Sequence, residues 1–309
     1  MLAHLLRRLY LFQVLGGALL GSYLAVRHSA AGSATALWWI PLLAIVLPLV
    51  LQFLVIATSM VRSCADGYSS FWWRAFWGEF QAALTVFVLR MPWAGKPPGV
   101  LLPTAAAATG VNAPPVLLVH GYICNHRVWD DLVTALRQAG HPVLTLDLEP
   151  LFTSIDDYAP LIDNAITTLL ARTGGQKVSL VGHSMGGLAI RAWLRAYGSS
   201  RVERIITLGT PHQGTRIARA AMTVNGTQMV WHSPWLAALA HRENQQQRAL
   251  MHIALTVQDN IVYPQREQVL AGAQVTEFQG LGHLELCLDT QVIHWVRQTL
   301  EAPGPAAAP

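Results

Sequence analysis

The fold of this chain is decided by the stretch Val178-Ser179-Leu180-Val181-Gly182-His183-Ser184-Met185-Gly186-Gly187. It begins as an apolar run rich in strand-forming residues, and apolar residues at helical spacing follow it directly. We therefore expect a strand, a sharp turn and a helix, with Ser184 at the apex. Such a turn crowds its neighbours, so small residues are needed two positions to either side, where Gly182 and Gly186 stand. The Ser184 hydroxyl would then project clear of a sheet, in front of a helix N-terminus that favours developing negative charge.

The composition indicates that part of the protein avoids water. Hydrophobic residues make up 52% of the 309 residues and charged residues only 12%, against about 25% charged residues in an average protein. The formal net charge is +4, and no block of lysine or arginine is present. Arginines beside apolar stretches suit anionic headgroups, so we expect membrane lipids as partners and no nucleic acid. Three widely spaced cysteines indicate neither a disulfide framework nor a zinc site.

Two apolar segments near the N-terminus predict a membrane hairpin. Residues 9–26 and residues 36–58 contain no charged side chain, and a membrane-spanning helix needs about 20 apolar residues. Glycines at 16, 17 and 21 suit close helix packing. A signal peptide is the alternative for the first segment, but a second span follows after a short loop, which favours an uncleaved hairpin.

The placement of arginines predicts the orientation of this hairpin. Arg7 and Arg8 precede the first segment, and Arg27 alone lies in the loop. Arg62 and Arg74 follow the second segment. The positive-inside rule then places both ends of the hairpin in the cytoplasm and the loop outside.

An aromatic segment at about 69–91 follows the hairpin. It contains Phe71-Trp72-Trp73-Arg74-Ala75-Phe76-Trp77, and aromatic residues beside arginine predict an amphipathic helix lying in the headgroup zone. Ordinary packing against the downstream domain is the alternative. We therefore expect residues 1–93 to form a membrane-anchoring region and residues 94–114, which are rich in proline and alanine, to form a linker.

Apolar strands alternate with amphipathic helices over residues 115–301. This alternation predicts an α/β domain with a mostly parallel sheet covered by helices on both faces, and a short cap insertion at about 216–248. Residues 302–309 are expected to form a disordered tail. Ligands of such sheets bind beyond the C-terminal ends of the strands. The candidate residues expected there are His120, Ser184, His212, Asp259 and His283.

We predict Ser184 as a nucleophile. Its hydroxyl requires a base within hydrogen-bond reach, and the base requires an acceptor that orients it. His283 follows the last expected strand, in a glycine-containing loop from which its ring could swing over the sheet. Asp259 follows the preceding strand and is the predicted acid, with Asp147 as the fallback. The alternative role for Asp259 is to cap a helix that begins after it. We therefore predict Ser184, Asp259 and His283 as the catalytic residues.

Acyl transfer also requires donors that bind the oxyanion of the tetrahedral intermediate. The backbone N–H of Met185, directly after the nucleophile, is one predicted donor. The N–H of Tyr122, after the first strand of the domain, is the other, with Ile123 as its alternative. His120 and His212 border the same crevice and are predicted to shape the substrate site, with His120 also bracing its own loop.

Three motifs taken together resemble the α/β-hydrolase fold, and within it the bacterial lipases and esterases. They are His120-Gly121-Tyr122, Gly182-His183-Ser184-Met185-Gly186-Gly187 and Gly209-Thr210-Pro211-His212-Gln213-Gly214-Thr215. The chain order serine, aspartate, histidine is also that of the family. The resemblance covers about residues 115–301. It implies cleavage of carboxylic esters through an acyl-serine, with no metal or organic cofactor. The hairpin lies outside the shared motifs, and from it we expect a protein of the bacterial inner membrane with its hydrolase domain in the cytoplasm. The chain departs from the family in showing no clear opening antiparallel strands, so we expect a short sheet.

The leading hypothesis is a membrane-anchored serine hydrolase that acts on lipid or acyl esters. A thioesterase or an acyltransferase would use the same triad, and the residues do not separate these activities. A third hypothesis is a membrane-tethered binding module that uses the fold without catalysis. The presence of all three predicted triad residues argues against it.

Overall fold

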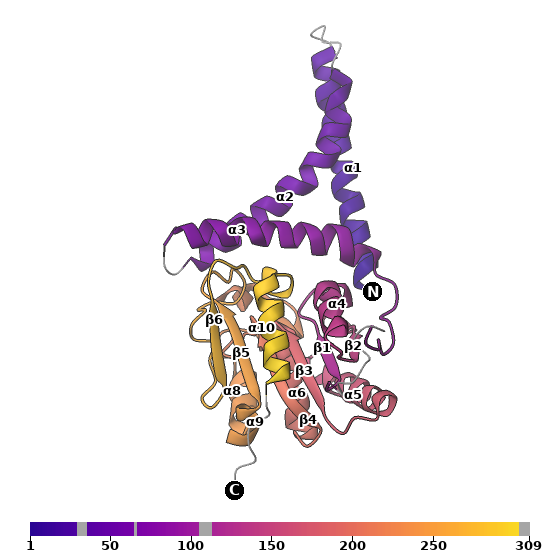
Figure 1. Cartoon of the computed structure of the whole chain (residues 1–309). Coiled ribbons are helices and arrows are strands. Elements are labelled where there is room, and N and C mark those ends of the chain that lie inside the picture. Colours follow the sequence, from indigo (N-terminus) through magenta and orange to yellow (C-terminus); the bar gives the residue numbers. More distant parts are fainter. Residues whose placement is uncertain (30–35, 65–66, 105–112, 303–309) are drawn as a thin grey trace.

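The computed structural model describes residues 1–29, 36–64, 67–104 and 113–302. Figure 1 shows an α/β domain, two long helices that project from it, and a further helix lying between those helices and the domain. The disordered tail expected from the sequence lies, beyond Ala302, outside the described residues, and so does part of the predicted linker.

The domain is built on a six-stranded parallel sheet in the order β2-β1-β3-β4-β5-β6. Strands β1 and β3 are buried along their whole length, because helices cover both faces of the sheet. No antiparallel strand opens the described part of the sheet, but an antiparallel bridge joins Leu101 to Val143. The strands are β1 (Val116–Val119), β2 (Val143–Leu146), β3 (Val178–His183), β4 (Val202–Leu208), β5 (Met251–Thr256) and β6 (Gln274–Phe278).

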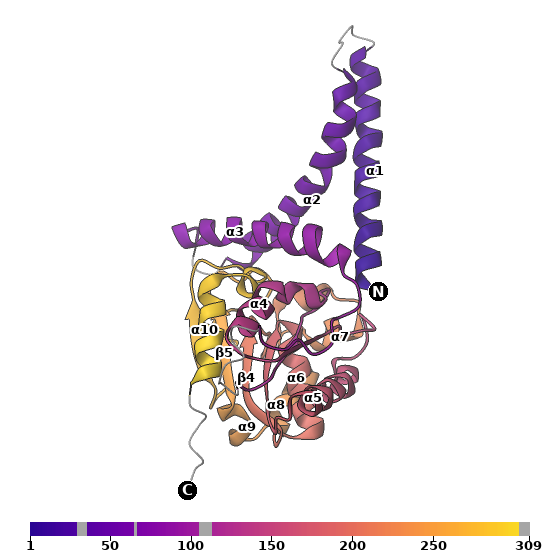
Figure 2. The same cartoon turned by 45° about the vertical axis from the view of Figure 1, so that its right-hand side comes forward.

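Helices pack on the two faces through apolar stripes at helical spacing. Helices α4 (Asp130–Gln138) and α10 (Thr290–Glu301) contribute to one core cluster. Helices α5 (Ala159–Thr173) and α6 (Met185–Tyr197) contribute to the other, and the two pairs lie on opposite sides of the sheet in Figures 1 and 2. Asp289 caps α10 by accepting hydrogen bonds from the N–H groups of its first turn.

The segment between β4 and β5 contains only short helices. A 3-10 helix (Arg216–Ala220) is followed by α7 (Val224–Gln228), α8 (Pro234–Arg242) and α9 (Gln245–Ala249). A buried ion pair between Arg191 of α6 and Glu243 ties this segment to the domain. The expected insertion at 216–248 is therefore made of short helices, and its role as a cap over the site stays a prediction.

The two projecting helices are α1 (Leu2–Ser29) and α2 (Trp39–Ser63), and each extends beyond the segment expected from the sequence. Both are long and apolar enough to cross a membrane, by length and composition. A Cβ at Gly17 or Gly21 would lie 2.2 or 2.3 Å from a backbone carbonyl oxygen of α2. These glycines therefore allow the two helix backbones into contact, as predicted.

Helix α3 (Ser70–Ala83) lies across the domain and continues through a π-helix (Leu84–Arg90) and a 3-10 helix (Met91–Trp93). One side of α3, including Ala75 and Phe76, is buried in the same core cluster as α4 and α10. Phe71, Trp73 and Trp77 remain exposed on the helix. Packing against the domain is thus confirmed for one face, and contact of the other face with headgroups stays a prediction.

Replacing Gly186 with alanine is expected to destabilise this fold. A Cβ at Gly186 would lie 2.1 Å from the backbone carbonyl oxygen of Val119 in β1, so only a displacement of the strand or of α6 relieves the clash. Overpacking of this kind costs about 1–3 kcal/mol, and we expect a lower Tm in thermal unfolding followed by circular dichroism. Gly95→Ala is the control, because its Cβ would meet nothing within 4 Å. Equal Tm values for the two variants would contradict the crowding argument.

Candidate active site

Ser184 lies at the predicted turn between β3 and α6. Its backbone is at φ 54° and ψ −127°, a conformation that costs a non-glycine residue about 1–3 kcal/mol. A Cβ at Gly182 would lie 2.7 Å from the backbone nitrogen of Gly187, and one at Gly121 would lie 2.8 Å from Cβ of Ser184. The turn therefore presents Ser184 at the C-terminal edge of the sheet, against the loop that follows β1.

Asp259 and His283 form a hydrogen-bonded pair at the same edge of the sheet. Nδ1 of His283 lies 2.8 Å from Oδ2 of Asp259, and both residues are buried. The other oxygen of Asp259 accepts hydrogen bonds from the backbone N–H groups of Ile261 and Val262 at 2.9 and 2.7 Å. Asp259 thus caps a turn, the alternative role foreseen for it, and orients the histidine at the same time. Since Nδ1–H donates to the carboxylate, Nε2 is the nitrogen that remains to act as a base.

His283 lies beside the residue that precedes the predicted nucleophile. The ring centroids of His183 and His283 are 4.6 Å apart, and Nε2 of His183 donates to the carbonyl oxygen of His283 at 3.1 Å. Among the residues that the structure describes, no hydrogen bond joins the Ser184 hydroxyl to His283. Catalytic hydrogen bonds are often long without substrate and tighten in the Michaelis complex. The roles of Ser184, Asp259 and His283 therefore stay predictions, which the pairing of acid and base supports.

The two neighbouring imidazoles differ in their affinity for protons. Burial lowers the pKa of His283, but the charge and hydrogen bond of Asp259 and the charge of Glu79 outweigh burial, so this pKa is raised. Burial and the charge of His283 hold the pKa of His183 well below its usual range. His183 is accordingly a neutral structural group, whereas His283 is suited to accept a proton.

The predicted oxyanion donors lie next to Ser184. Met185 is the first residue of α6, so its N–H has no acceptor within the helix. Tyr122 lies in the turn after β1, where Ile123 adopts φ 51°. Within the described ranges, neither the N–H of Met185 nor that of Tyr122 is seen donating to another part of the chain. Their assignment as oxyanion donors stays a prediction. The Tyr122 hydroxyl lies 3.0 Å from Oγ1 of Thr223 and ties this loop to the cap.

His120 and His212 are buried and use both ring nitrogens within the protein. Nδ1 of His120 donates to the carbonyl oxygen of Gly121 at 2.9 Å, and Nε2 accepts from the N–H of Leu148 at 3.0 Å. Nε2 of His212 lies 3.0 Å from Oγ1 of Thr207, and its Nδ1 lies 3.4 Å from a guanidinium nitrogen of α6. Burial lowers the pKa of both histidines. The two rings brace the loops around the site, and their contact with substrate stays a prediction.

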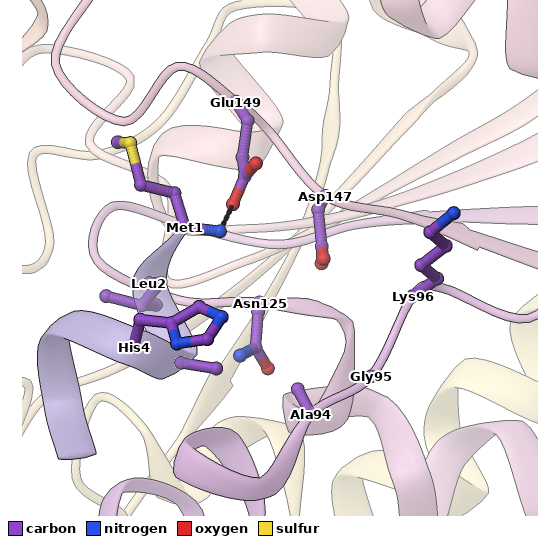
Figure 3. A pocket seen from close by; sticks show the side chains of 10 residues that line it. Met1, Leu2, His4, Ala94, Gly95, Lys96, Asn125, Asp147 and Glu149 are labelled. Atoms are coloured by element: carbon purple, nitrogen blue, oxygen red, sulfur yellow. Dashed lines mark hydrogen bonds and ion pairs between the residues drawn. The ribbon is translucent and has the colours of Figure 1, made fainter.

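The fallback acid, Asp147, has other partners than His283. Its Oδ1 accepts the backbone N–H of His126 at 2.7 Å and lies 3.0 Å from Nδ1 of the same residue. Asp147 lines a cavity of about 300 Å³, and Figure 3 shows it there together with Asn125, Lys96 and the N-terminal residues Met1, Leu2 and His4. The structure therefore favours Asp259 over Asp147 as the partner of His283. Across the described ranges, no group of three or more His, Cys, Asp or Glu side chains is placed to hold a metal ion.

Two polar residues beside Asp259 and His283 are not predicted from the sequence. Oδ1 of Asn260 accepts the backbone N–H of His283 at 3.1 Å, and its place next to the predicted acid is a signal that could have found it. Glu79 lies behind the histidine loop and accepts the N–H of Leu284, 205 positions away in the chain. Its position inside the aromatic segment offers no signal of this role.

The domain is similar in sequence to proteins of the α/β-hydrolase fold. Residues 114–229 match the profile of a family described as alpha/beta hydrolase fold. A triacylglycerol lipase of Burkholderia plantarii is 33% identical over 127 residues, which cover 38% of this chain and 35% of that protein. A triacylglycerol lipase of Pseudarthrobacter phenanthrenivorans is 33% identical over 113 residues, which cover 34% of this chain and 35% of that protein. The chain thus spans about a third of the length of these curated relatives.

A solved structure shows the same fold. The mature form of lipase BlEst2 from Bacillus licheniformis superposes with a TM-score of 0.54 at 18% sequence identity, covering 66% of this chain and 96% of that chain. This likeness and the family match agree with the parallel sheet and its two helical layers. The domain therefore has the α/β-hydrolase fold, and lipases are among the proteins to which it is similar.

Proposed function

We propose that this chain is a membrane-anchored serine hydrolase that cleaves carboxylic esters of lipids through an acyl-serine intermediate. The observation that carries the proposal is the 2.8 Å pair of Asp259 and His283 at the sheet edge where Ser184 occupies its strained turn. The similarity to two triacylglycerol lipases supports an ester as the substrate.

The reaction follows from the roles that this arrangement gives to each group. Oγ of Ser184 attacks the ester carbonyl carbon while its proton moves to Nε2 of His283, and Asp259 stabilises the resulting imidazolium. The carbonyl oxygen becomes an oxyanion that the N–H groups of Tyr122 and Met185 bind. His283 then protonates the departing alkoxide, which leaves as an alcohol. A water molecule then attacks the carbonyl carbon of the acyl-serine and gives a proton to His283. The bond to Oγ of Ser184 breaks, the carboxylic acid leaves, and His283 returns the proton to Oγ, which restores the free serine and the neutral imidazole.

The helical hairpin supports the membrane part of the proposal. Within the most apolar 18 residues of each helix, only 17% of the residues of α1 and 6% of those of α2 are buried. Side chains such as Phe12, Leu19 and Val55 are exposed. Continuous exposed apolar surface marks an interaction site for lipid or protein, and the helix lengths match the hydrocarbon thickness of a bilayer. Because α3 contacts the histidine loop, a bilayer around the hairpin would lie close to the site. This placement favours lipid esters as substrates.

Fluorophosphonate labelling tests the proposed nucleophile. The full-length protein in detergent micelles is expected to react with a fluorophosphonate probe, and Ser184→Ala is expected to abolish the labelling. Turnover of p-nitrophenyl esters, vesicle-borne glycerolipids and acyl-thioesters by the same preparation then separates an esterase or lipase from a thioesterase. Labelling that persists in the Ser184→Ala variant would overturn the assignment.

A further inference from the structure

The loop that carries His283 is held by side chains at four consecutive backbone N–H groups. The N–H groups of residues 282 and 283 donate to Oε2 of Glu285 at 2.9 Å and to Oδ1 of Asn260 at 3.1 Å. The N–H groups of Leu284 and Glu285 both donate to one oxygen, Oε2 of Glu79, at 2.8 and 3.0 Å. Two of these four N–H groups are therefore bound by a residue of α3, a helix that precedes the α/β domain.

Two glycines allow α3 to come this close. A Cβ at Gly282 would lie 2.5 Å from Cβ of Glu79, and one at Gly78 would lie 2.1 Å from a carboxylate oxygen of Glu285. The sequence predicts a loop that is free to swing, whereas the structure shows Gly282 in direct contact with α3. Glu79 is only 4% exposed. Its carboxylate is thus enclosed between the helix and the loop, where a buried charge requires the hydrogen bonds that it receives.

Helix α2 holds the loop of the acid in a similar way. Nδ2 of Asn260 donates to Oγ of Ser59 at 2.9 Å, while Oδ1 of the same amide accepts the N–H of the base. Nε2 of Gln265 donates at 2.9 Å to the carbonyl oxygen of Ser63, the last residue of α2, and to that of Asp259. Buried hydrogen bonds thus connect both members of the acid–base pair to the N-terminal helices.

Glu79 also places a titratable group next to the base. Burial raises the pKa of Glu79 to about 7, although the charge of His283 and the N–H donors oppose this rise. In its charged form Glu79 contributes, after Asp259, to the raised pKa of His283. A carboxylate here stabilises the imidazolium that forms when the base accepts a proton. The titratable groups that face Glu79 are His283, Asp259, Glu285, Cys124 and Cys287.

On the basis of the triad proposed above, we propose that Glu79 is a positioning residue for the catalytic base. By binding the N–H groups of Leu284 and Glu285 it fixes the loop that presents His283, so α3 is part of the catalytic unit as well as of the anchor. Without this carboxylate two buried donors lose their acceptor, and the loop rotates the imidazole away from its partners. A displacement of about 1 Å in a catalytic group lowers the rate by about 10²-fold.

Two substitutions of Glu79 test this role in the full-length protein in detergent micelles. Turnover of a short-chain p-nitrophenyl ester is measured per active site, with the sites counted by complete fluorophosphonate labelling. We expect Glu79→Ala to lower kcat by about 10²-fold with little change in KM. Glu79→Gln keeps an oxygen acceptor and is expected to recover most of kcat, while the lost charge moves the acid limb of the kcat/KM profile to lower pH. Gln81→Ala, at an exposed position of α3, is the control and keeps wild-type kcat.

The outcomes separate this proposal from a purely structural role. Wild-type kcat per labelled site together with an unshifted acid limb in the Glu79 variants overturns it, even if their Tm is lower. If Glu79→Ala does not fold, the acid limb of the kcat/KM profile of Glu79→Gln is the deciding measurement. A shift to lower pH supports the proposal, and an unshifted limb overturns it. Wild-type protein that is not labelled at Ser184 defeats the proposed function itself, because that measurement does not depend on Glu79.

Discussion

Ser184→Ala is expected to lower kcat for ester hydrolysis by about 10⁶-fold, the loss that follows removal of a nucleophilic serine from a complete triad. The methyl group of alanine has no proton to give to His283 and cannot form the acyl intermediate. The residual rate would come from substrate binding and the oxyanion donors alone. Initial rates with a p-nitrophenyl ester over several enzyme concentrations measure the loss.

A serine in the same strand provides the matched control. Ser179 lies in β3 and is buried, and its hydroxyl has no hydrogen-bond partner among the described residues. Ser179→Ala therefore removes an equivalent atom without removing a contact, and wild-type kcat is expected. Activity of Ser184→Ala within tenfold of the wild type would show that another group attacks the ester.

Asp259→Asn is expected to lower kcat by about 10⁴-fold, as loss of the acid does in an established triad. An asparagine at this position still accepts the two backbone N–H groups that Asp259 binds, so the turn should persist. The change instead removes the charge that holds the His283 tautomer and stabilises its protonated form. Kinetic assays with matched circular dichroism spectra separate this effect from unfolding.

The same variant is expected to shift the pH profile. The base works only when neutral, so activity falls as pH decreases through the pKa of His283, which Asp259 raises above its ordinary value of 6.5. Loss of the carboxylate lowers this pKa, and the acid limb of kcat/KM moves to lower pH. Asp147→Asn is the control, because Asp147 binds His126 instead. A larger loss of kcat in Asp147→Asn than in Asp259→Asn would reverse the assignment of the acid.

The N-terminal helices and the α/β domain pack together in this protein. Helices α2 and α3 share a core cluster with the face of the sheet that carries α4 and α10, and both reach the loops of the acid and the base. Forces on the hairpin in a bilayer would therefore act on the positions of Asp259 and His283. This packing brings a glutamate of the aromatic segment, Glu79, within hydrogen-bond distance of the loop that carries His283.

The sequence alone determined the turn at Ser184 and the parallel sheet, and it placed His283, Asp259 and Asp147 among the candidate residues at the strand ends. These features depend on residues that are adjacent in the chain, such as Gly182 and Gly186 around the serine, or on the order of strands, which periodicity reveals. The tertiary structure decided that Asp259 rather than Asp147 pairs with the base, because the partner depends on which loops meet above the sheet.

Only the tertiary structure revealed Glu79, Ser59 and Asn260 as supports of the acid–base pair. Glu79 and Leu284 are 205 positions apart, and Ser59 and Asn260 are 201 positions apart. Periodicity in a sequence reports which face of an element is buried, but it does not report which other element covers that face. The packing of α2 and α3 onto the domain supplies that information. It places the buried Glu79 of α3 where its carboxylate accepts hydrogen bonds from the loop of His283.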